Sequence, residues 1–173
     1  GNDDPLSRKC AFEAVDLLAE LDQSDIELRC AALNALVSVS LGPDPRSTYA
    51  ASVAEFSRAV DESGVLADPA SAHFFQFLVH TADIDLPGAI TEVQRSLQCA
   101  SSGRVGELMV VLSAFGAVLD VLRGNLEAAE FAYAELARQL TAVGAPSGAE
   151  LGVVGKVVIG WARGSLAHLV DEV

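Results

Sequence analysis

The chain has 173 residues, of which 51% are apolar and 6% aromatic, and this composition argues against intrinsic disorder. A domain of this size buries roughly 70% of the surface of its unfolded chain, so its core needs no metal or disulfide support. With 24 acidic and 11 basic residues, the net charge is −13, which repels phosphate backbones and anionic lipid. We therefore expect no direct nucleic-acid contact by this segment and no membrane association.

Apolar residues recur at spacings of three and four, and no segment alternates with a period of two, which predicts helices and no strands. A capping box is expected at Ser24–Glu27. Glycines such as Gly124 and Gly164 are expected to close helices, because glycine accepts the left-handed conformation of a helix end. In chain order, the nine expected helices are 5–21, 25–41, 46–63, 69–82, 87–101, 104–123, 126–143, 148–163 and 165–173.

An internal repeat of about 40 residues relates the later helices. Asp85-Leu86 aligns with Asn125-Leu126, and the stretch 123–126 aligns with the stretch 163–166. A period near 40 with two helices per repeat indicates stacked helical hairpins, because one hairpin cannot cover both of its apolar faces. The fold class expected is therefore all-α, an α-solenoid of stacked antiparallel hairpins. In this phase 25–41 pairs with 46–63, 69–82 with 87–101, and 104–123 with 126–143.

One stretch of the chain carries a family resemblance. The residues that carry it are Leu112, Phe115, Gly116 and Leu119 in a first helix, followed by Gly124, Ala129, Tyr133 and Leu136. Their order resembles the tetratricopeptide pattern, which implies a right-handed superhelix with a concave groove. The long, degenerate repeats and the phrase at 122–129 resemble the helical sensor region of LuxR and maltose-regulator-type bacterial transcriptional regulators. The resemblance implies a non-catalytic sensor module that binds a protein, a peptide or a small-molecule effector in its groove.

Residues 1–173 are expected to form one helical repeat domain. The chain starts Gly-Asn-Asp-Asp and not with Met, so we expect it to be a fragment of a longer protein. In the repeat phase, the helix at 148–163 is a first helix whose partner stops after nine residues. An apolar face left uncovered there predicts self-association into a homo-oligomer.

First helices of tetratricopeptide-like repeats line the groove, and this resemblance selects the candidate site residues. They are Asn34, Ser38, His73, Phe77, His80, Ser113, Asp120 and Lys156, with Ala117 and Gly152 as neighbours in the same row. The alternative is that these are ordinary polar residues on a solvated helix face.

Two features of 69–82 allow more than one interpretation. His73 and His80 lie on one side of the helix about 10.5 Å apart along its axis, which is too far for one zinc ion. The pair is either pH-responsive, ligand-facing or simply solvated. Phe75 fits the packing position, whereas Phe77 either packs in the core or anchors an apolar ligand. Further along, Trp161 is expected to pack between helices.

No arrangement of residues indicates chemistry. No Ser/His/Asp or Cys/His constellation has a suitable context, so no catalytic residue, metal ligand or cofactor is predicted. Cys10, Cys30 and Cys99 are far apart in the sequence, which favours small buried side chains in a reducing cytoplasm. The alternative function is a structural adaptor that mediates protein–protein contacts, and an all-helical enzyme is the least favoured reading.

Overall fold

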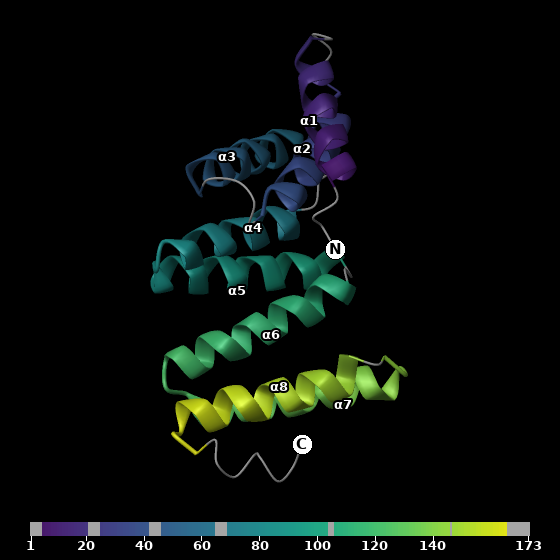
Figure 1. The fold of residues 1–173 in the computed structure, drawn as a ribbon. Coiled ribbons are helices and arrows are strands. Elements are labelled where there is room, and N and C mark those ends of the chain that lie inside the picture. The colour runs from purple at the N-terminus through teal and green to yellow at the C-terminus, as the bar shows by residue number, and fades with distance from the viewer. Residues whose placement is uncertain are drawn as a thin grey trace. The chain divides into compact units, whose positions relative to one another are not determined.

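The computed structural model describes residues 5–20, 25–41, 46–64, 69–103, 106–145 and 147–165. These residues form eight α-helices joined by short turns and contain no strand (Figure 1). The helices are α1 (Pro5–Glu20), α2 (Ile26–Ser40), α3 (Arg46–Ser63), α4 (Pro69–Ala82), α5 (Leu86–Gly103), α6 (Gly106–Leu122), α7 (Leu126–Ala142) and α8 (Ser147–Ala162). The all-helical class is therefore confirmed, and the ninth expected helix lies, apart from Ser165, outside the described residues.

Aspartate side chains fix two helix starts. The N-cap of α2 is Asp25, whose carboxylate accepts the N–H groups of Glu27 and Leu28 at 3.1 and 3.2 Å. The expected cap at Ser24 was wrong by one residue, because the Asp25 carboxylate reaches the free N–H groups of the first turn. Asp85 plays the same part for α5 by accepting the N–H of Gly88 at 3.2 Å, so this helix starts at Leu86.

One turn geometry closes most of the described helices. After α6, Gly124 N–H donates to the Val121 carbonyl at 2.9 Å and Asn125 N–H donates to the Asp120 carbonyl at 2.9 Å. This pair of bonds is a Schellman turn, which needs a left-handed residue just past the helix. Glycines with positive φ supply that residue at Gly64, Gly124, Gly144 and Gly164. The glycine stops predicted at Gly124 and Gly164 are confirmed, and Gly64 and Gly144 are of the same kind.

The first compact unit, Gly1–Cys99, has a core formed by α2, α3 and α4. Consecutive helices of this unit pack on one another from α1 to α4. Phe56 of α3 meets Phe75 of α4 edge to face, with ring centroids 6.0 Å apart. Val37 and Val53 are fully buried beside them. The packing role predicted for Phe75 is confirmed.

The second compact unit, Ala100–Val173, contains α6, α7 and α8. Here α7 packs on both neighbours, and α6 also contacts α8. Gly155 allows the close approach of α8 to α7, because a Cβ atom there would lie 2.6 Å from Tyr133 Cβ and Cγ. Tyr133, Ala129 and Ala117 form the centre of this core. The one helix pair that the repeat phase proposed within this unit, 104–123 with 126–143, is therefore in contact as α6 and α7.

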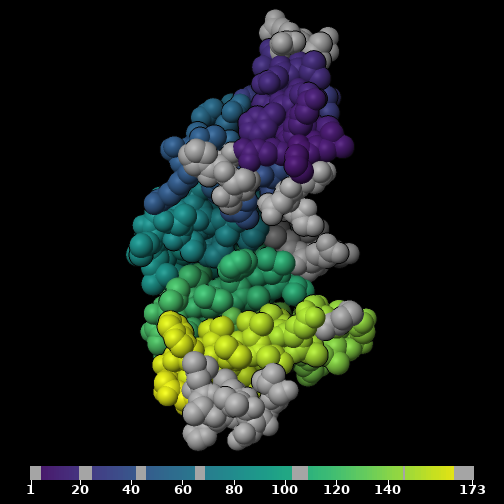
Figure 2. Space-filling view, viewed as in Figure 1, coloured from purple at the N-terminus to yellow at the C-terminus, as the bar shows by residue number. Residues whose placement is uncertain are grey.

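Several side chains of α8 lie at the surface. Trp161 is 66% exposed, so the prediction that it packs between helices was wrong. Val153, Val154 and Val157 are also exposed, and Figure 2 shows α8, in yellow, at the surface of the second unit. The exposed apolar face expected on this helix is present. No helix within the described residues is long and apolar enough to cross a membrane.

Candidate functional site

Two imidazole–carboxylate pairs join α4 to α5 in the first unit. His73 Nδ1 lies 2.7 Å from Glu92 Oε2, and His80 Nδ1 lies 2.8 Å from Asp85 Oδ2. His80 lies seven residues after His73 on α4. Asp85, just before α5, lies seven residues before Glu92, as antiparallel helices require (Figure 1). The sequence correctly predicted that both histidines lie on one side of α4, but it did not predict the carboxylates that they contact.

Polar groups continue along the same helix contact. Glu92 is only 8% exposed and also accepts a hydrogen bond from Arg95 at 2.9 Å. Ser96, which is fully buried, donates to the Ala70 carbonyl at 2.6 Å. Buried polar groups in hydrogen-bonded pairs fix the register of two helices more sharply than apolar contacts do. His73 therefore helps to hold α4 against α5, although its own side chain is half-exposed.

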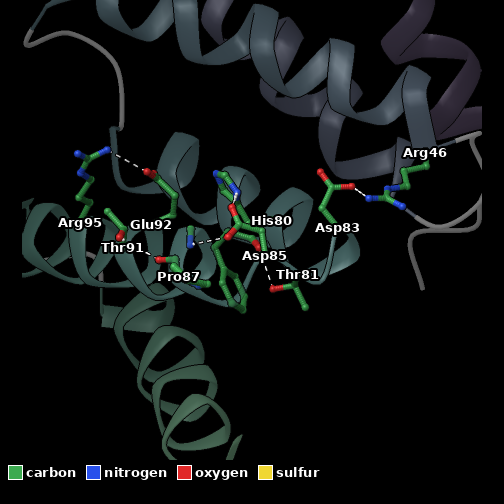
Figure 3. Close-up of polar contacts among 11 residues, drawn as sticks. Arg46, His80, Thr81, Asp83, Asp85, Pro87, Thr91, Glu92 and Arg95 are labelled. Atoms are coloured by element: carbon green, nitrogen blue, oxygen red, sulfur yellow. Dashed lines mark hydrogen bonds and ion pairs between the residues drawn. The ribbon is translucent and has the colours of Figure 1, made fainter. Parts of the chain in front are cut away.

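The turn between α4 and α5 is held by Asp85 (Figure 3). The Gly88 N–H and the His80 imidazole hold the pKa of Asp85 below its usual value. A Cβ atom at Gly88 would lie 2.3 Å from both His80 Nδ1 and Asp85 Oδ2, so only glycine leaves room for this pair. Beside it, Asp83 forms an ion pair with Arg46 at the start of α3. The turn is thus tied to three helices.

Phe77 belongs to the interior of the first unit. It is 2% exposed and stacks on Phe74 with ring centroids 6.2 Å apart. Of the two readings of Phe77, the structure favours core packing, since the side chain offers almost no surface to a ligand. Asn34 and Ser38 are half-buried on α2, where the Ser38 hydroxyl donates to the Asn34 carbonyl at 2.8 Å.

Asp120 and His80 occupy equivalent positions forty residues apart. The Asp120 carboxylate lies 3.4 Å from Asn125 Nδ2. In the same way, the His80 ring lies beside the Asp85 carboxylate in the turn forty residues earlier. Asp120 also pairs with Arg123 at 3.6 Å. Both side chains therefore stabilise a helix end. Of their neighbours in the predicted row, Ser113 is half-buried on α6, and Ala117 is 1% exposed in the core and was wrongly placed in a groove.

An apolar trough of about 500 Å³ lies in the second unit between α6 and α8, with α7 as its floor. We call this cavity the trough. Its walls are Val110, Val111, Ala114, Phe115 and Val118 of α6, Tyr133 and Leu140 of α7, and Ser147, Glu150, Leu151 and Val154 of α8. Ser113 and Asp120 do not line it, because α6 turns a different face toward α8 than the repeat phase predicts.

A second cavity of about 410 Å³ lies between α7 and α8, and we call it the Lys156 pocket. Lys156 and Gly152, both predicted as groove residues, line it together with Arg163 and Glu130. The Arg163 guanidinium donates to the Glu130 carboxylate at 2.7 Å across the two helices. Tyr133 lines both this pocket and the trough. The sequence signal that could have found the pocket is the run of glycines on α8.

Two further groups of residues concern side-chain chemistry, the candidate metal ligands and the cysteines. The described part of the chain contains no group of three histidine, cysteine or acidic side chains that could hold a metal ion. Cys10 is exposed, Cys30 is buried and Cys99 is half-buried. The prediction that the cysteines are buried is therefore confirmed only for Cys30. No protein-family model, curated protein or solved structure matches this sequence.

Proposed function

We propose that this chain is a non-catalytic regulatory module that binds a partner in the trough, and that it is the sensor segment of a bacterial transcriptional regulator. The observation that carries the proposal is the trough itself. It is an open apolar cavity between two alternate helices of a stacked series, with a volume typical of ligand sites. Such cavities are where helical repeat proteins present binding surfaces.

The repeat supports a solenoid of tetratricopeptide type, which forms part of this proposal. The turns that end at Asp85, Asn125, Ala145 and Ser165 share the same two backbone bonds. In the three of these turns that lie forty residues apart, the side chain of the last residue also contacts the residue five positions earlier, at 2.8 Å for Asp85, 3.4 Å for Asn125 and 3.4 Å for Ser165. Equivalent contacts at a spacing of forty residues are what a structural repeat produces.

The apolar walls favour an occupant with an apolar face, either a protein segment or a small molecule. Val111 and Val154, on opposite walls, are 41% and 47% exposed. Covering them would remove apolar surface from water at roughly 25 cal/mol per Å². A structural adaptor is the second function that this surface supports, because the same walls would serve a permanent protein contact.

Charge substitutions in the trough test this proposal. Val111→Lys and Val154→Lys change exposed side chains, so the fold should survive, whereas any trough ligand should lose its affinity. Val153→Lys is the matched control, since Val153 is 48% exposed on the same helix and does not line the trough. The measurement is a thermal-shift screen of metabolites and helical display peptides. Binders that tolerate both trough variants, or no binders at all, would contradict the proposal.

The regulator context has its own test. The parent reading frame is expected to encode an ATP-binding module before this segment or a helix-turn-helix after it. A reading frame that encodes only this segment would favour the adaptor function instead. In that case the trough variants should still disrupt a protein complex.

A further inference from the structure

The apolar residues on the two outer walls of the trough follow a regular spacing. On α6 and on α8 they recur at alternating intervals of three and four residues. A helix turns about 100° per residue, so each set stays on one side of its helix. We call these sets the α6 row, which is Val111, Phe115, Val118 and Leu122, and the α8 row, which is Leu151, Val154, Val158 and Trp161.

Both rows continue past the trough. Their last members, Leu122 and Trp161, do not line it, and they are 57% and 66% exposed. Because α6 and α8 each pack antiparallel to α7, they run in the same direction, and both rows finish at the same end of the second unit (Figure 1). Leu122 lies eleven residues after Val111, which is about 16.5 Å along the axis of α6. The trough and the exposed ends of the rows form one elongated surface, which we call the strip.

The length of the strip favours a helix as its occupant. A small molecule that fills the trough would leave Leu122 and Trp161 in water. An amphipathic helix covers both, because its own apolar residues recur every three or four positions and meet the two rows along their length. At 5.4 Å per turn, the strip fits about three turns of such a helix.

A carboxylate on the α8 wall gives the strip a negative charge. Glu150 lines the trough, is exposed, and forms no hydrogen bond or ion pair with another described residue. The arginines described in this unit each pair with a different acid, namely Arg123 with Asp120, Arg138 with Glu135 and Arg163 with Glu130. A lysine or arginine on the occupant would therefore be attracted to Glu150, whereas a second copy of this chain, with a net charge of −13, would be repelled.

We infer that the strip binds an amphipathic helix of a partner protein, with apolar residues at intervals of three and four and a lysine or arginine beside Glu150. The inference rests on the proposed function, because it names the occupant of the trough. It also goes further, since it selects a protein helix over a small molecule and extends the contact to Leu122 and Trp161.

Peptide display on the full chain tests the kind of occupant. The probe is a library of helical peptides of about 14 residues, with apolar residues fixed at intervals of three and four and the other positions varied. A second library has the same composition with the apolar positions scrambled. Only the first library should yield binders, and these should carry lysine or arginine in preference to glutamate. No binders, binders from both libraries, or a preference for glutamate would overturn the inference.

Substitutions beyond the trough test the length of the contact. Leu122→Lys and Trp161→Lys change exposed side chains, so the fold should survive. Each should weaken binding of a selected peptide about tenfold or more, measured by fluorescence anisotropy, because the contact would then bury a charge in place of an apolar group. Val153→Lys is the control, since Val153 is exposed on α8 but lies outside the α8 row.

The same measurements separate this inference from the proposed function. If Val111→Lys and Val154→Lys abolish binding while Leu122→Lys and Trp161→Lys do not, the trough remains a binding site and the helix is overturned. Sedimentation of the free protein gives a further check. A wild-type dimer that Leu122→Lys dissociates would also overturn the inference, because a second copy of the chain would then occupy the strip.

Charge reversal at Glu150 has a matched control. Glu127 is also an exposed acid in the first turn of its helix, and it does not line the trough. Glu150→Lys should weaken a basic peptide about fivefold to tenfold and strengthen the same peptide with its lysines replaced by glutamate. Glu127→Lys should change neither affinity. Equal effects of the two variants would show that only net charge acts, and would overturn the placement of a cation beside Glu150.

Discussion

Ile84 occupies the position where four other helix ends have glycine. Its φ of 57° is left-handed, and its side chain is 91% exposed. A β-branched residue in this conformation costs roughly 1–2 kcal/mol relative to an unstrained one, because Cβ crowds the backbone. The backbone bonds of the turn, from Ile84 to Thr81 and from Asp85 to His80, hold it there.

Ile84→Gly should therefore raise the free energy of unfolding by about 1 kcal/mol, since glycine adopts a left-handed φ without strain. The reverse change, Gly124→Ala, should lower it by a similar amount, because the φ of Gly124 is 82°. Urea unfolding measures both. If Ile84→Gly destabilised the protein, the isoleucine side chain would have to make contacts that outweigh its backbone strain.

Tyr49 carries a buried hydroxyl that has no hydrogen-bond partner among the described residues. Burial raises its pKa to about 12. An unpaired buried polar group costs free energy, so Tyr49→Phe should raise the free energy of unfolding by about 1 kcal/mol. Thermal and urea unfolding would measure the change. A loss of stability on removal of the hydroxyl would reveal a bound water that satisfies it.

Asp85 gives the α4–α5 turn a defined pH dependence. Its pKa is lowered in the folded state by Gly88 N–H and His80, so its contribution to stability is present above the unfolded pKa near 3.8. The contribution is lost as the pH falls through the lower, folded-state pKa. Asp85→Asn should thus be less stable than the wild type at neutral pH, and the difference should shrink below pH ~4. Asp61→Asn, an exposed acid on α3, is the control; an equal effect would contradict the assignment.

Close helix contacts are set by small residues at particular crossings. Gly155 of α8 meets the Tyr133 side chain of α7, and a Cβ atom there would approach to 2.6 Å. Gly148 shows the same relation to Thr141, whose backbone nitrogen would lie 2.8 Å from a Cβ atom. These glycines are packing residues, although single-sequence reasoning treats glycine inside a helix only as a weak position.

Gly155→Ala should lower the free energy of unfolding by about 1–3 kcal/mol, because α8 must move away from Tyr133. Gly116→Ala in α6 is the matched control, since no atom lies within 4 Å of its added Cβ. That change should raise stability by about 0.5–1 kcal/mol through the helix preference of alanine. Calorimetric melting of both variants tests the contrast. Similar shifts in both would mean that the helix crossing can relax.

At the scale of the whole molecule, charge opposes folding. A net charge of −13 on 173 residues creates self-repulsion that is greatest in the compact state. Raising the salt concentration from about 0.02 M to about 0.3 M should therefore raise the melting temperature at neutral pH. Near the isoelectric point of 4.4 the net repulsion vanishes, so the salt effect should be small there. A salt-independent melting temperature at neutral pH would show that repulsion is negligible.

The sequence predicted the helices well, but not which side chains they bury, and the reason differs between the two. Helix ends depend on local bonds, so left-handed glycines such as Gly124 and Gly164 could be identified from residue type alone. Site residues depend on which face of a helix meets another. The repeat phase put Phe77 in a groove, and the small and β-branched residues before Trp161 suggested that it packs between helices. Phe77 is in fact 2% exposed and Trp161 is 66% exposed.

The sequence by itself determined the helical class, the places where most helices end, and the forty-residue relation between the turns. The helical class and the helix ends follow from contacts within a few residues of the chain, and the relation between the turns follows from the alignment of one segment with another. Only the tertiary structure decided that His73 meets Glu92, that Tyr133 lines two cavities, and that Trp161 lies at the surface. The physical reason is composition: with 51% apolar residues, the helices offer more apolar faces than the core can bury, and only packing selects among them.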